Sequence, residues 1–277
     1  MSGSDLGAAA AAWAATTRVE AGGTEIRYRE AGAGLPVVLV HGLGMASDYW
    51  ARTGPALAAA GYRVLAPDLP GFGESEGAEG GLPPHRQAEV LREWADVLRL
   101  GAAVYIGHSL SCQSVVELAA ATPRAVLALV LTAPTGEGGR GRMVHEAIGL
   151  ARDAWHERAR LVVLAAHAYL RAGPKRFWQT WRAGADREMV SLLPWIAVPV
   201  LVVVGDQDPV VSTGHAGDLV RRTPRGELCI VPGGTHAVFH HDPERYNRAV
   251  LEFLAKRVGD ATFSPGAGGE DVRRPPS

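Results

Sequence analysis

Short apolar runs alternate with amphipathic segments along most of the chain. Near-continuous apolar runs are typical of strands that are buried on both faces of a parallel sheet. The segment 85–100 instead has apolar residues at helical spacing, with Val90, Leu91, Trp94 and Val97 on one side. Strands alternating with helices predict an α/β fold, a mostly parallel sheet flanked by helices. We expect strands at 24–30 (an early edge strand), 36–40, 62–66, 103–106, 126–131, 198–204 and 228–231.

This alternation stops after Thr135. Residues 136–193 carry no clear strand signal and contain helix-like segments around 143–152, 154–171 and 174–183, the last beginning with Pro174. Strand signals resume at Val198. We therefore expect a helical cap over 136–193, inserted after the strand at 126–131 and lying over the C-terminal edge of the sheet, where binding sites of open α/β sheets are found.

Aromatic residues cluster in the last part of this cap. Phe177 and Trp181 are four positions apart and share a helical face, with Trp178 beside them. We expect these three residues to line an apolar substrate pocket. The alternative for each of them, and for Trp155 and Tyr169, is that they only hold the cap helices together.

Composition sets the domain organisation. The 277 residues are 47% hydrophobic, which suits one large domain with an insertion: a core over 18–135 and 194–258, and the cap. Residues 1–17 are rich in alanine without a basic segment, which indicates a flexible arm or a short helix and not a signal peptide. Residues 259–277 are rich in Gly, Pro and charge and are expected to be a flexible tail.

Charge and cysteine content exclude several function classes. The formal net charge of −1 favours neither nucleic acid nor an anionic membrane, and no apolar run is long enough for a membrane span. The two cysteines, Cys112 and Cys229, make no disulfide framework, so we expect a cytoplasmic protein. No zinc-type spacing occurs, and no cofactor or metal is implied. The sequence is also compatible with a homo-oligomer.

The most specific local motif is the segment 107–111, with the sequence GHSLS. It follows the apolar run 103–106 and precedes the helix-like segment 112–120. A serine on such a strand-to-helix turn is exposed at a helix N-terminus, where a developing anion is favoured. Ser109 is therefore a candidate nucleophile, although the motif has Ser111 where G-x-S-x-G has glycine. The alternative is an ordinary turn in which Ser109 caps the helix.

A nucleophilic serine needs a base and a carboxylate that orients the base. After the run 198–204 the chain continues with GDQDPVV, and after 228–231 with PGGTH. Asp208 and His236 thus lie just past strand ends, at the same edge of the sheet as Ser109. We prefer Asp208 to Asp206, which is closer to the strand end and can fix the loop.

Two further histidines compete with His236. His240 and His241 lie beyond the Gly-Gly turn, in a segment that leads into a helix at Pro243. Their position is less suited to meeting a residue at a strand end, so we prefer His236.

An oxyanion formed at Ser109 would need two N–H donors. The backbone N–H of Leu110 is the first candidate. The second is the N–H of Leu43, in the HGLG loop 41–44 after the run 36–40. We expect His41 to be structural and to brace this loop.

Together these segments resemble the α/β-hydrolase superfamily, in its lid-bearing branch with a serine nucleophile. The resemblance covers roughly residues 18–258 and includes the segment 68–75, DLPGFGES, similar to a loop of the family that is generally structural. It implies a mostly parallel eight-stranded sheet and a catalytic triad of Ser109, Asp208 and His236.

The resemblance also limits the reaction. Haloalkane dehalogenases and many epoxide hydrolases of this fold have an aspartate where this chain has Ser109. We expect hydrolysis of a small-molecule carboxylic ester, or a related acyl substrate such as a thioester or lactone, through an acyl-enzyme. The first alternative is carbon–carbon bond hydrolysis of a β-diketone-like ring-cleavage product. The second alternative, from another class, is a ligand receptor or a scaffold protein. Scaffold proteins of this fold often lose the triad, which this chain keeps. A receptor can keep it, so only a measurement of turnover distinguishes a receptor from an enzyme.

Overall fold

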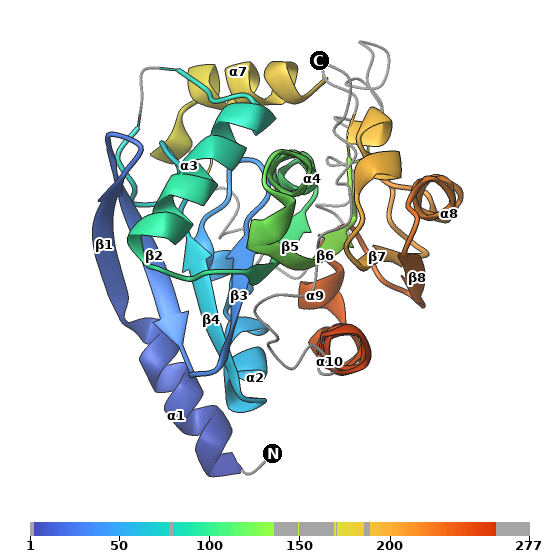
Figure 1. Ribbon diagram of the computed structural model, residues 1–277, viewed down its shortest axis with the longest axis horizontal. Helices are drawn as coiled ribbons and strands as arrows, with labels where there is room; N and C mark the ends of the chain where they lie inside the picture. Colours follow the sequence, from blue (N-terminus) through green and yellow to red (C-terminus); the bar gives the residue numbers. More distant parts are fainter. Residues whose placement is uncertain are drawn as a thin grey trace.

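A computed structural model describes residues 3–77, 80–135, 149, 169, 171–185 and 189–258. Its centre is an eight-stranded sheet with the order β1-β2-β4-β3-β5-β6-β7-β8 (Figure 1). The strands β1, β2 and β4 pair antiparallel, and all other neighbours are parallel. The strands are β1 (Thr16–Ala21), β2 (Thr24–Ala31), β3 (Leu35–Val40), β4 (Tyr62–Pro67), β5 (Ala103–His108), β6 (Val126–Thr132), β7 (Val200–Gly205) and β8 (Gly226–Val231).

The predicted α/β fold with a mostly parallel sheet is confirmed. Strands β5 and β7 are buried at every position, which explains why they were visible in the sequence as continuous apolar runs. The expected edge strand at 24–30 is β2, but it is not at the edge, because β1 pairs with its outer side. Strand β1 is polar and largely exposed, so it carries no apolar run that the sequence analysis could detect.

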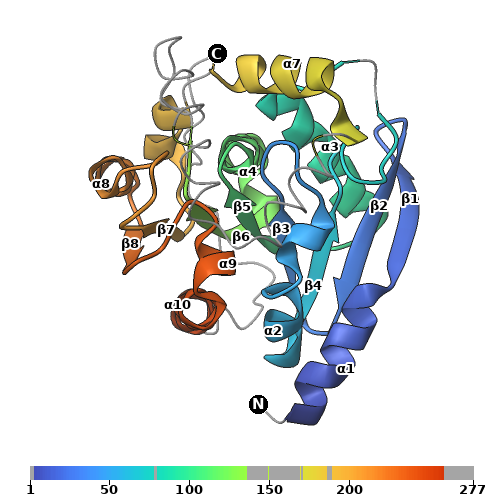
Figure 2. The ribbon, with the colours of Figure 1, turned by 180° about the vertical axis from the view of Figure 1, so that it is seen from behind.

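Helices cover both faces of the sheet (Figures 1 and 2). On one face, α3, α4 and α8 contribute Leu91, Val115 and Leu219 to the core. On the other face, α1, α2 and α10 contribute Trp13, Leu57 and Val250. The helices of these two layers are α1 (Gly3–Ala14), α2 (Gly54–Ala59), α3 (Pro84–Val97), α4 (Ser111–Ala121), α8 (Thr213–Arg222), α9 (Val238–His241) and α10 (Pro243–Arg257); short 3-10 turns occur at Ser47–Trp50 and Pro123–Ala125.

Residues 3–14 of the N-terminal segment form helix α1, the second of the two alternatives. Trp13 is only 4% exposed, and its ring packs directly against the backbone of Gly54 at the start of α2. The Arg29 guanidinium in β2 binds the carbonyl oxygens of Trp13 (2.8 Å) and Ala14 (3.1 Å) at the C-terminal end of α1. The partners of α1 are distant in sequence, so local composition could not reveal this docking.

Only part of the expected cap lies within the described residues. Helix α7 (Pro174–Ala185) begins at the expected proline, and the 3-10 turns Met189–Ser191 and Leu193–Trp195 follow it. The helix expected at 143–152 and most of that at 154–171 lie outside the described residues, as does the tail 259–277. Both ribbon views show α7 lying across the ends of α3 and α4. In the described part of the chain, no helix is long and apolar enough to cross a membrane.

Ser111, the residue that departs from the G-x-S-x-G pattern, links three elements. Its Oγ accepts a hydrogen bond from the His108 N–H (2.9 Å) at the end of β5. The same Oγ lies 2.9 Å from the carbonyl oxygen of Val40 at the end of β3 and 3.0 Å from that of His108, and can donate to either. A glycine would provide none of these contacts. The hydroxyl therefore ties the start of α4 to the strand that leads into the 41–44 loop.

The docking of α1 predicts a stability difference between two of its apolar residues. Trp13→Ala should lower the free energy of unfolding by about 3 kcal/mol, because it empties a buried site against α2. Leu6→Ala, at a position that is 43% exposed on the same helix, should lower it by less than about 0.5 kcal/mol. Urea denaturation followed by circular dichroism measures both values, and equal losses would contradict the packing of Trp13.

The Ser111 contacts predict a second stability effect. Ser111→Ala removes the hydroxyl that contacts the His108 N–H and the carbonyl oxygens of Val40 and His108. It should lower the free energy of unfolding by about 1–3 kcal/mol, because these buried groups lose a hydrogen-bond partner. Thr122→Ala is the control, because among the described residues the Thr122 hydroxyl donates only to the Leu118 carbonyl of its own helix. It should cost less than about 0.5 kcal/mol. A Ser111→Ala protein as stable as the wild type in urea would show that the contacts of this hydroxyl do not stabilise the fold.

Candidate active site

Ser109 lies on a sharp turn between β5 and α4. Its backbone has φ = 54°, in the left-handed region that a non-glycine residue rarely adopts. The turn is held by hydrogen bonds from the Ser109 N–H to the Thr132 carbonyl (2.9 Å) and from the Cys112 N–H to the Ser109 carbonyl (3.1 Å). It also requires Gly107, since a Cβ there would lie 3.0 Å from the Cys112 Cα. This backbone separates the Ser109 side chain from both the strand and the helix.

The structure brings Ser109, His236 and Asp208 together in one chain of hydrogen bonds. His236 Nε2 lies 3.1 Å from Ser109 Oγ, and its Nδ1 lies 3.0 Å from Asp208 Oδ2. The three residues come from the loops after β5, β8 and β7, which end at one edge of the sheet. The side chains of His236 and Asp208 are 4% and 0% exposed. The imidazole therefore stands between a hydroxyl and a buried carboxylate.

Asp206 and Asp208 have different partners. The free oxygen of Asp208, Oδ1, accepts hydrogen bonds from the N–H groups of Val210 (2.7 Å) and Val211 (3.0 Å). These two N–H donors fix the orientation of the carboxylate. Asp206 is exposed, and its Oδ1 accepts from the Gly233 N–H (2.6 Å). Asp206 thus connects the loop after β7 to the loop after β8, whereas Asp208 contacts the His236 ring itself.

These two loops meet at a close backbone contact. A Cβ added to Gly205 would overlap the Gly234 carbonyl, and the Gln207 N–H donates to that same carbonyl (3.0 Å). Glycine at both positions lets the loops approach closely enough for Asp208 to reach His236. The rival histidine His240 instead lies in α9, where its Nε2 is 2.7 Å from the Tyr49 carbonyl.

The two candidate oxyanion donors come from two different segments. The Leu110 N–H stands at the N-terminus of α4, and the Leu43 N–H belongs to the loop that follows β3. Neither N–H has a backbone or side-chain acceptor among the described residues. Helix N-termini stabilise negative charge, so this arrangement suits an anion that forms beside Ser109.

His41 braces the loop that carries Leu43. Its Nε2 accepts a hydrogen bond from the Leu69 N–H (2.9 Å), so its proton resides on Nδ1, which donates to the Gly42 carbonyl (2.9 Å). Burial lowers the pKa of His41 below its usual value, which keeps the ring neutral and Nε2 free to accept.

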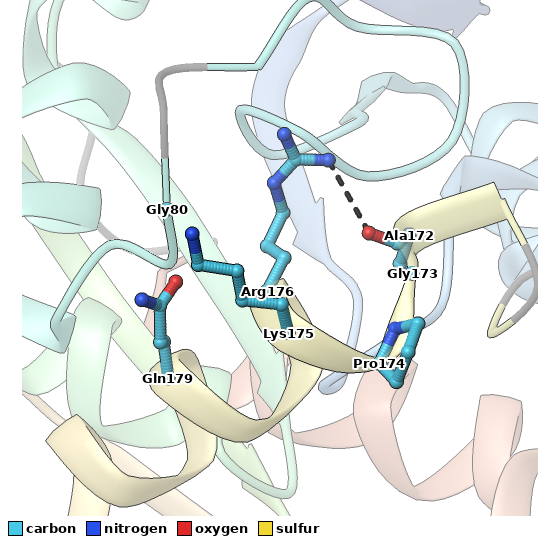
Figure 3. A pocket seen from close by; sticks show the side chains of 7 residues that line it. All are labelled: Gly80, Ala172, Gly173, Pro174, Lys175, Arg176 and Gln179. Atoms are coloured by element: carbon cyan, nitrogen blue, oxygen red, sulfur yellow. Dashed lines mark hydrogen bonds between the residues drawn. The ribbon is translucent and has the colours of Figure 1, made fainter.

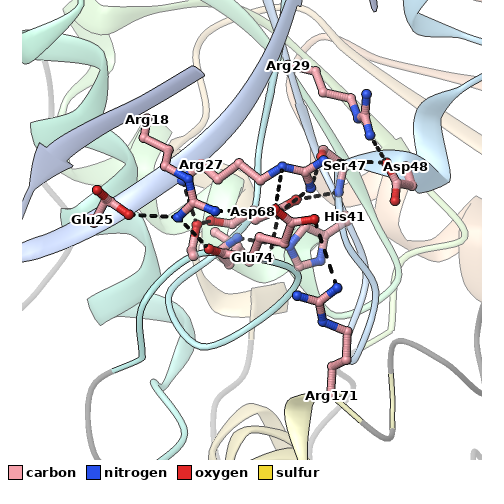
Figure 4. A network of polar contacts seen from close by, with 12 residues as sticks. Arg18, Glu25, Arg27, Arg29, His41, Ser47, Asp48, Asp68, Glu74 and Arg171 are labelled. Atoms are coloured by element: carbon pink, nitrogen blue, oxygen red, sulfur yellow. Dashed lines mark hydrogen bonds and ion pairs between the residues drawn. The ribbon is translucent and has the colours of Figure 1, made fainter. Parts of the chain in front are cut away.

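Asp68 anchors the loop next to His41 (Figure 4). Its carboxylate accepts from Arg27 (2.8 Å) and from the N–H groups of Ser47 (2.6 Å) and Glu74 (2.9 Å). Burial alone would raise the pKa of Asp68, but the His41 ring, these N–H donors and the guanidinium outweigh it and hold the pKa below its usual range. The segment 68–75 therefore acts as a support for the 41–44 loop.

Helix α7 spans the two loops that carry the candidate oxyanion donors. Gly44 leaves room for the rings of Tyr169 and Phe177, and Gly184 leaves room for the Leu110 side chain. Phe177 also contacts Trp181, with ring centroids 6.0 Å apart. Trp178 is 53% exposed and lies against Trp181 (5.9 Å). Of the three expected pocket residues, Phe177 lies next to the 41–44 loop, and Trp178 lies mostly in solvent.

A separate pocket of about 190 Å³ lies between α7 and the segment around Gly80 (Figure 3). None of its residues belongs to the three loops above; they are Gly80, Ala172, Gly173, Pro174, Lys175, Arg176 and Gln179. Within the described ranges, no cluster of three or more His, Cys, Asp or Glu residues could hold a metal ion.

His108 is a residue of this site that the sequence analysis did not single out. Its ring is buried among Tyr49, Phe239 and His236, with centroids 5.3, 5.1 and 5.0 Å away. Burial, followed by the nearby His236, lowers the pKa of His108 well below its usual value, so the ring is neutral. The available signal was its place in the motif, directly before Ser109.

Relatives with a similar sequence include several hydrolases. The chain is 31% identical to a 2-hydroxy-6-oxononadienedioate/2-hydroxy-6-oxononatrienedioate hydrolase of Burkholderia vietnamiensis, over 84% of this chain and 93% of the relative. It is also 31% identical to the dihydrolipoyllysine-residue acetyltransferase component of the acetoin cleaving system of Pseudomonas putida, over 87% of this chain and 70% of the relative.

Solved structures with the same fold include an esterase from Thermogutta terrifontis. Its TM-score is 0.77 at 22% identity, covering 87% of this chain and 98% of the esterase. A bromoperoxidase from Bacillus anthracis has a TM-score of 0.74 at 21% identity, covering 87% and 99%. Residues 37–249, from β3 to α10, match the model of the alpha/beta hydrolase family. The chain therefore belongs to the alpha/beta hydrolase family.

Proposed function

We propose that the protein is a serine hydrolase that cleaves a small-molecule carboxylic ester, or a related acyl substrate, through an acyl-enzyme. The observation that carries this proposal is the continuous hydrogen-bonded chain from Ser109 through His236 to Asp208. A serine, a base and a buried carboxylate in this order can activate the hydroxyl as a nucleophile.

The geometry supports a two-step reaction. Ser109 Oγ attacks the acyl carbon while its proton passes to His236 Nε2, and Asp208 stabilises the imidazolium. The N–H groups of Leu43 and Leu110 hold the oxyanion. Collapse of this intermediate breaks the ester bond, and the alcohol leaves with the proton from His236. A water molecule then gives a proton to His236 and attacks the acyl-enzyme, which releases the acid and returns the proton to Ser109.

The surroundings of Ser109 favour an apolar acyl group. The side chains of Leu43, Leu110 and Phe177 are apolar and come from the loops and the helix that border the nucleophile. Phe177 and Trp181 line the pocket in this proposal, with Trp178 at its rim. Both cysteines of the chain are free thiols, which supports a cytoplasmic location.

A second candidate reaction is hydrolysis of a carbon–carbon bond. Relatives from Burkholderia vietnamiensis and Metapseudomonas resinovorans, 31% and 28% identical to this chain, are hydrolases of 2-hydroxy-6-oxo dienoic acids. A serine, base and carboxylate also suit this chemistry, so the choice between the two bonds depends on the cap. A ligand receptor would keep the same residues without turnover.

Replacing the nucleophile tests the proposal. The wild type should hydrolyse p-nitrophenyl esters and take up one equivalent of a fluorophosphonate, as measured by intact mass spectrometry. Ser109→Ala should remove nearly all turnover, a loss of about 10⁶-fold in kcat, and all labelling. Ser114→Ala, one turn further along α4, should retain both, because the Ser114 hydroxyl is bound to Gln87.

The same measurement separates the alternatives. Unchanged labelling of Ser109→Ala would overturn the nucleophile. A wild type that cleaves a 2-hydroxy-6-oxo dienoic acid much faster than any ester would favour the carbon–carbon hydrolase. Binding without turnover of either class would favour a receptor.

The different partners of the two aspartates predict different kinetic effects. Asp208→Asn should lower kcat by about 10⁴-fold, because an amide in this place favours the wrong tautomer of His236. Asp206→Asn should lower kcat by less than about tenfold, since it weakens only one loop contact. Steady-state kinetics on one ester compares them, and a larger loss at Asp206 would reverse the two roles.

A further inference from the structure

The imidazole of His108 lies where three loops of the candidate site meet. It belongs to the end of β5, directly before Ser109. Its Nε2 lies 3.1 Å from the carbonyl oxygen of His236. Its Nδ1 lies against Gly42 in the 41–44 loop, where a Cβ would be 2.8 Å from this nitrogen. One ring therefore contacts the loops of the nucleophile, of the base and of the oxyanion donors.

The contacts determine which nitrogen of His108 carries the proton. A carbonyl oxygen only accepts, so Nε2 must be protonated and must donate to His236. Nδ1 is then an unprotonated nitrogen, and it is buried without a hydrogen-bond partner among the described residues. A second proton on Nδ1 would point at the backbone of Gly42, where it would find no acceptor, and would place a buried charge beside His236.

We propose that His108 is a positioning residue, which holds the backbone of His236 so that the His236 ring stands between Ser109 and Asp208. This inference rests on the proposed function. The His236 carbonyl and its imidazole belong to the same residue, so a donor to the carbonyl limits how the ring can move away from Ser109. Because His108 stays neutral, it provides this donor without opposing the positive charge that His236 acquires when it takes the serine proton.

The surroundings of His108 keep its ring in place. Tyr49 and Phe239 pack edge-on against it, at interplanar angles of 62° and 79°. Among the described residues, the titratable groups that face it are His236, His240, His41 and the phenol of Tyr49. None of these is a carboxylate that would favour a charged His108.

Three substitutions with different reach test the inference. His108→Gln places an amide N–H near the position of Nε2, His108→Asn ends about one bond short of it, and His108→Phe keeps the ring without a donor. With a p-nitrophenyl ester, His108→Phe and His108→Asn should lower kcat by about tenfold, the loss of one hydrogen bond. KM should stay within about twofold. His108→Gln should remain within about threefold of the wild type.

His240→Phe is the matched control, because His240 also contacts a backbone carbonyl, that of Tyr49, but outside the three loops. It should keep kcat within about twofold of the wild type. The rate of fluorophosphonate labelling of each variant gives a second readout, and circular dichroism establishes that each one is folded. The acid limb of the kcat pH profile should move in His108→Phe and not in His240→Phe. Only the first substitution removes the hydrogen bond to the His236 carbonyl and so lets the His236 ring change its position.

The outcomes separate the inference from the proposed function. A wild type that neither labels nor turns over would overturn both. A wild type that labels at Ser109, together with a His108→Phe protein that labels equally fast, would overturn the inference alone. Should His108→Phe not fold, the Gln and Asn pair decides: equal kcat values for these two would contradict a donor at the Nε2 position.

Discussion

The backbone of Ser109 is the constraint on which the rest of the site depends. A serine at φ = 54° is strained by about 1–3 kcal/mol, and this conformation persists only because its surroundings impose it. Gly107 lets α4 approach the end of β5, and the Thr132 carbonyl in β6 holds the Ser109 N–H. The Ser111 hydroxyl, which replaces the motif's glycine, adds a contact to β3. The strain is thus balanced by the central strands, the most deeply buried part of the fold.

Because strands β5 to β8 are parallel and in register, residues far apart in the sequence lie close together at one edge of the sheet. His108 pairs with Thr132, Thr132 with Val203, and Gly205 with Val231, so the loops after β5, β7 and β8 start at neighbouring points. The close contact between Gly205 and Gly234 completes the convergence of the last two loops. His41 and Asp68 support the 41–44 loop through buried polar contacts, and Arg171, in the segment before α7, lies 3.9 Å from Glu74 (Figure 4).

The sheet and the positions of the candidate residues could be predicted because they have local signals. Buried parallel strands are apolar throughout, and Ser109, Asp208 and His236 each follow such a strand. What the sequence could not reveal depends on distant partners. Strand β1 is polar, α1 is defined by the contact of Trp13 with Gly54, and Ser111 acquires its role from a carbonyl in β3. His108 is a single buried histidine in a short motif, and its contact with His236 exists only after three loops have folded together.

The central claim is that Ser109 attacks an acyl carbon while the N–H groups of Leu43 and Leu110 hold the oxyanion. A crystal structure of the wild type after reaction with an alkyl phosphonate ester tests it most directly, because the phosphonyl group imitates the tetrahedral intermediate. The account predicts a bond from phosphorus to Ser109 Oγ and a phosphonyl oxygen about 2.7–3.1 Å from both N–H groups. An adduct on another residue, or an oxygen that points away from both donors, would contradict it.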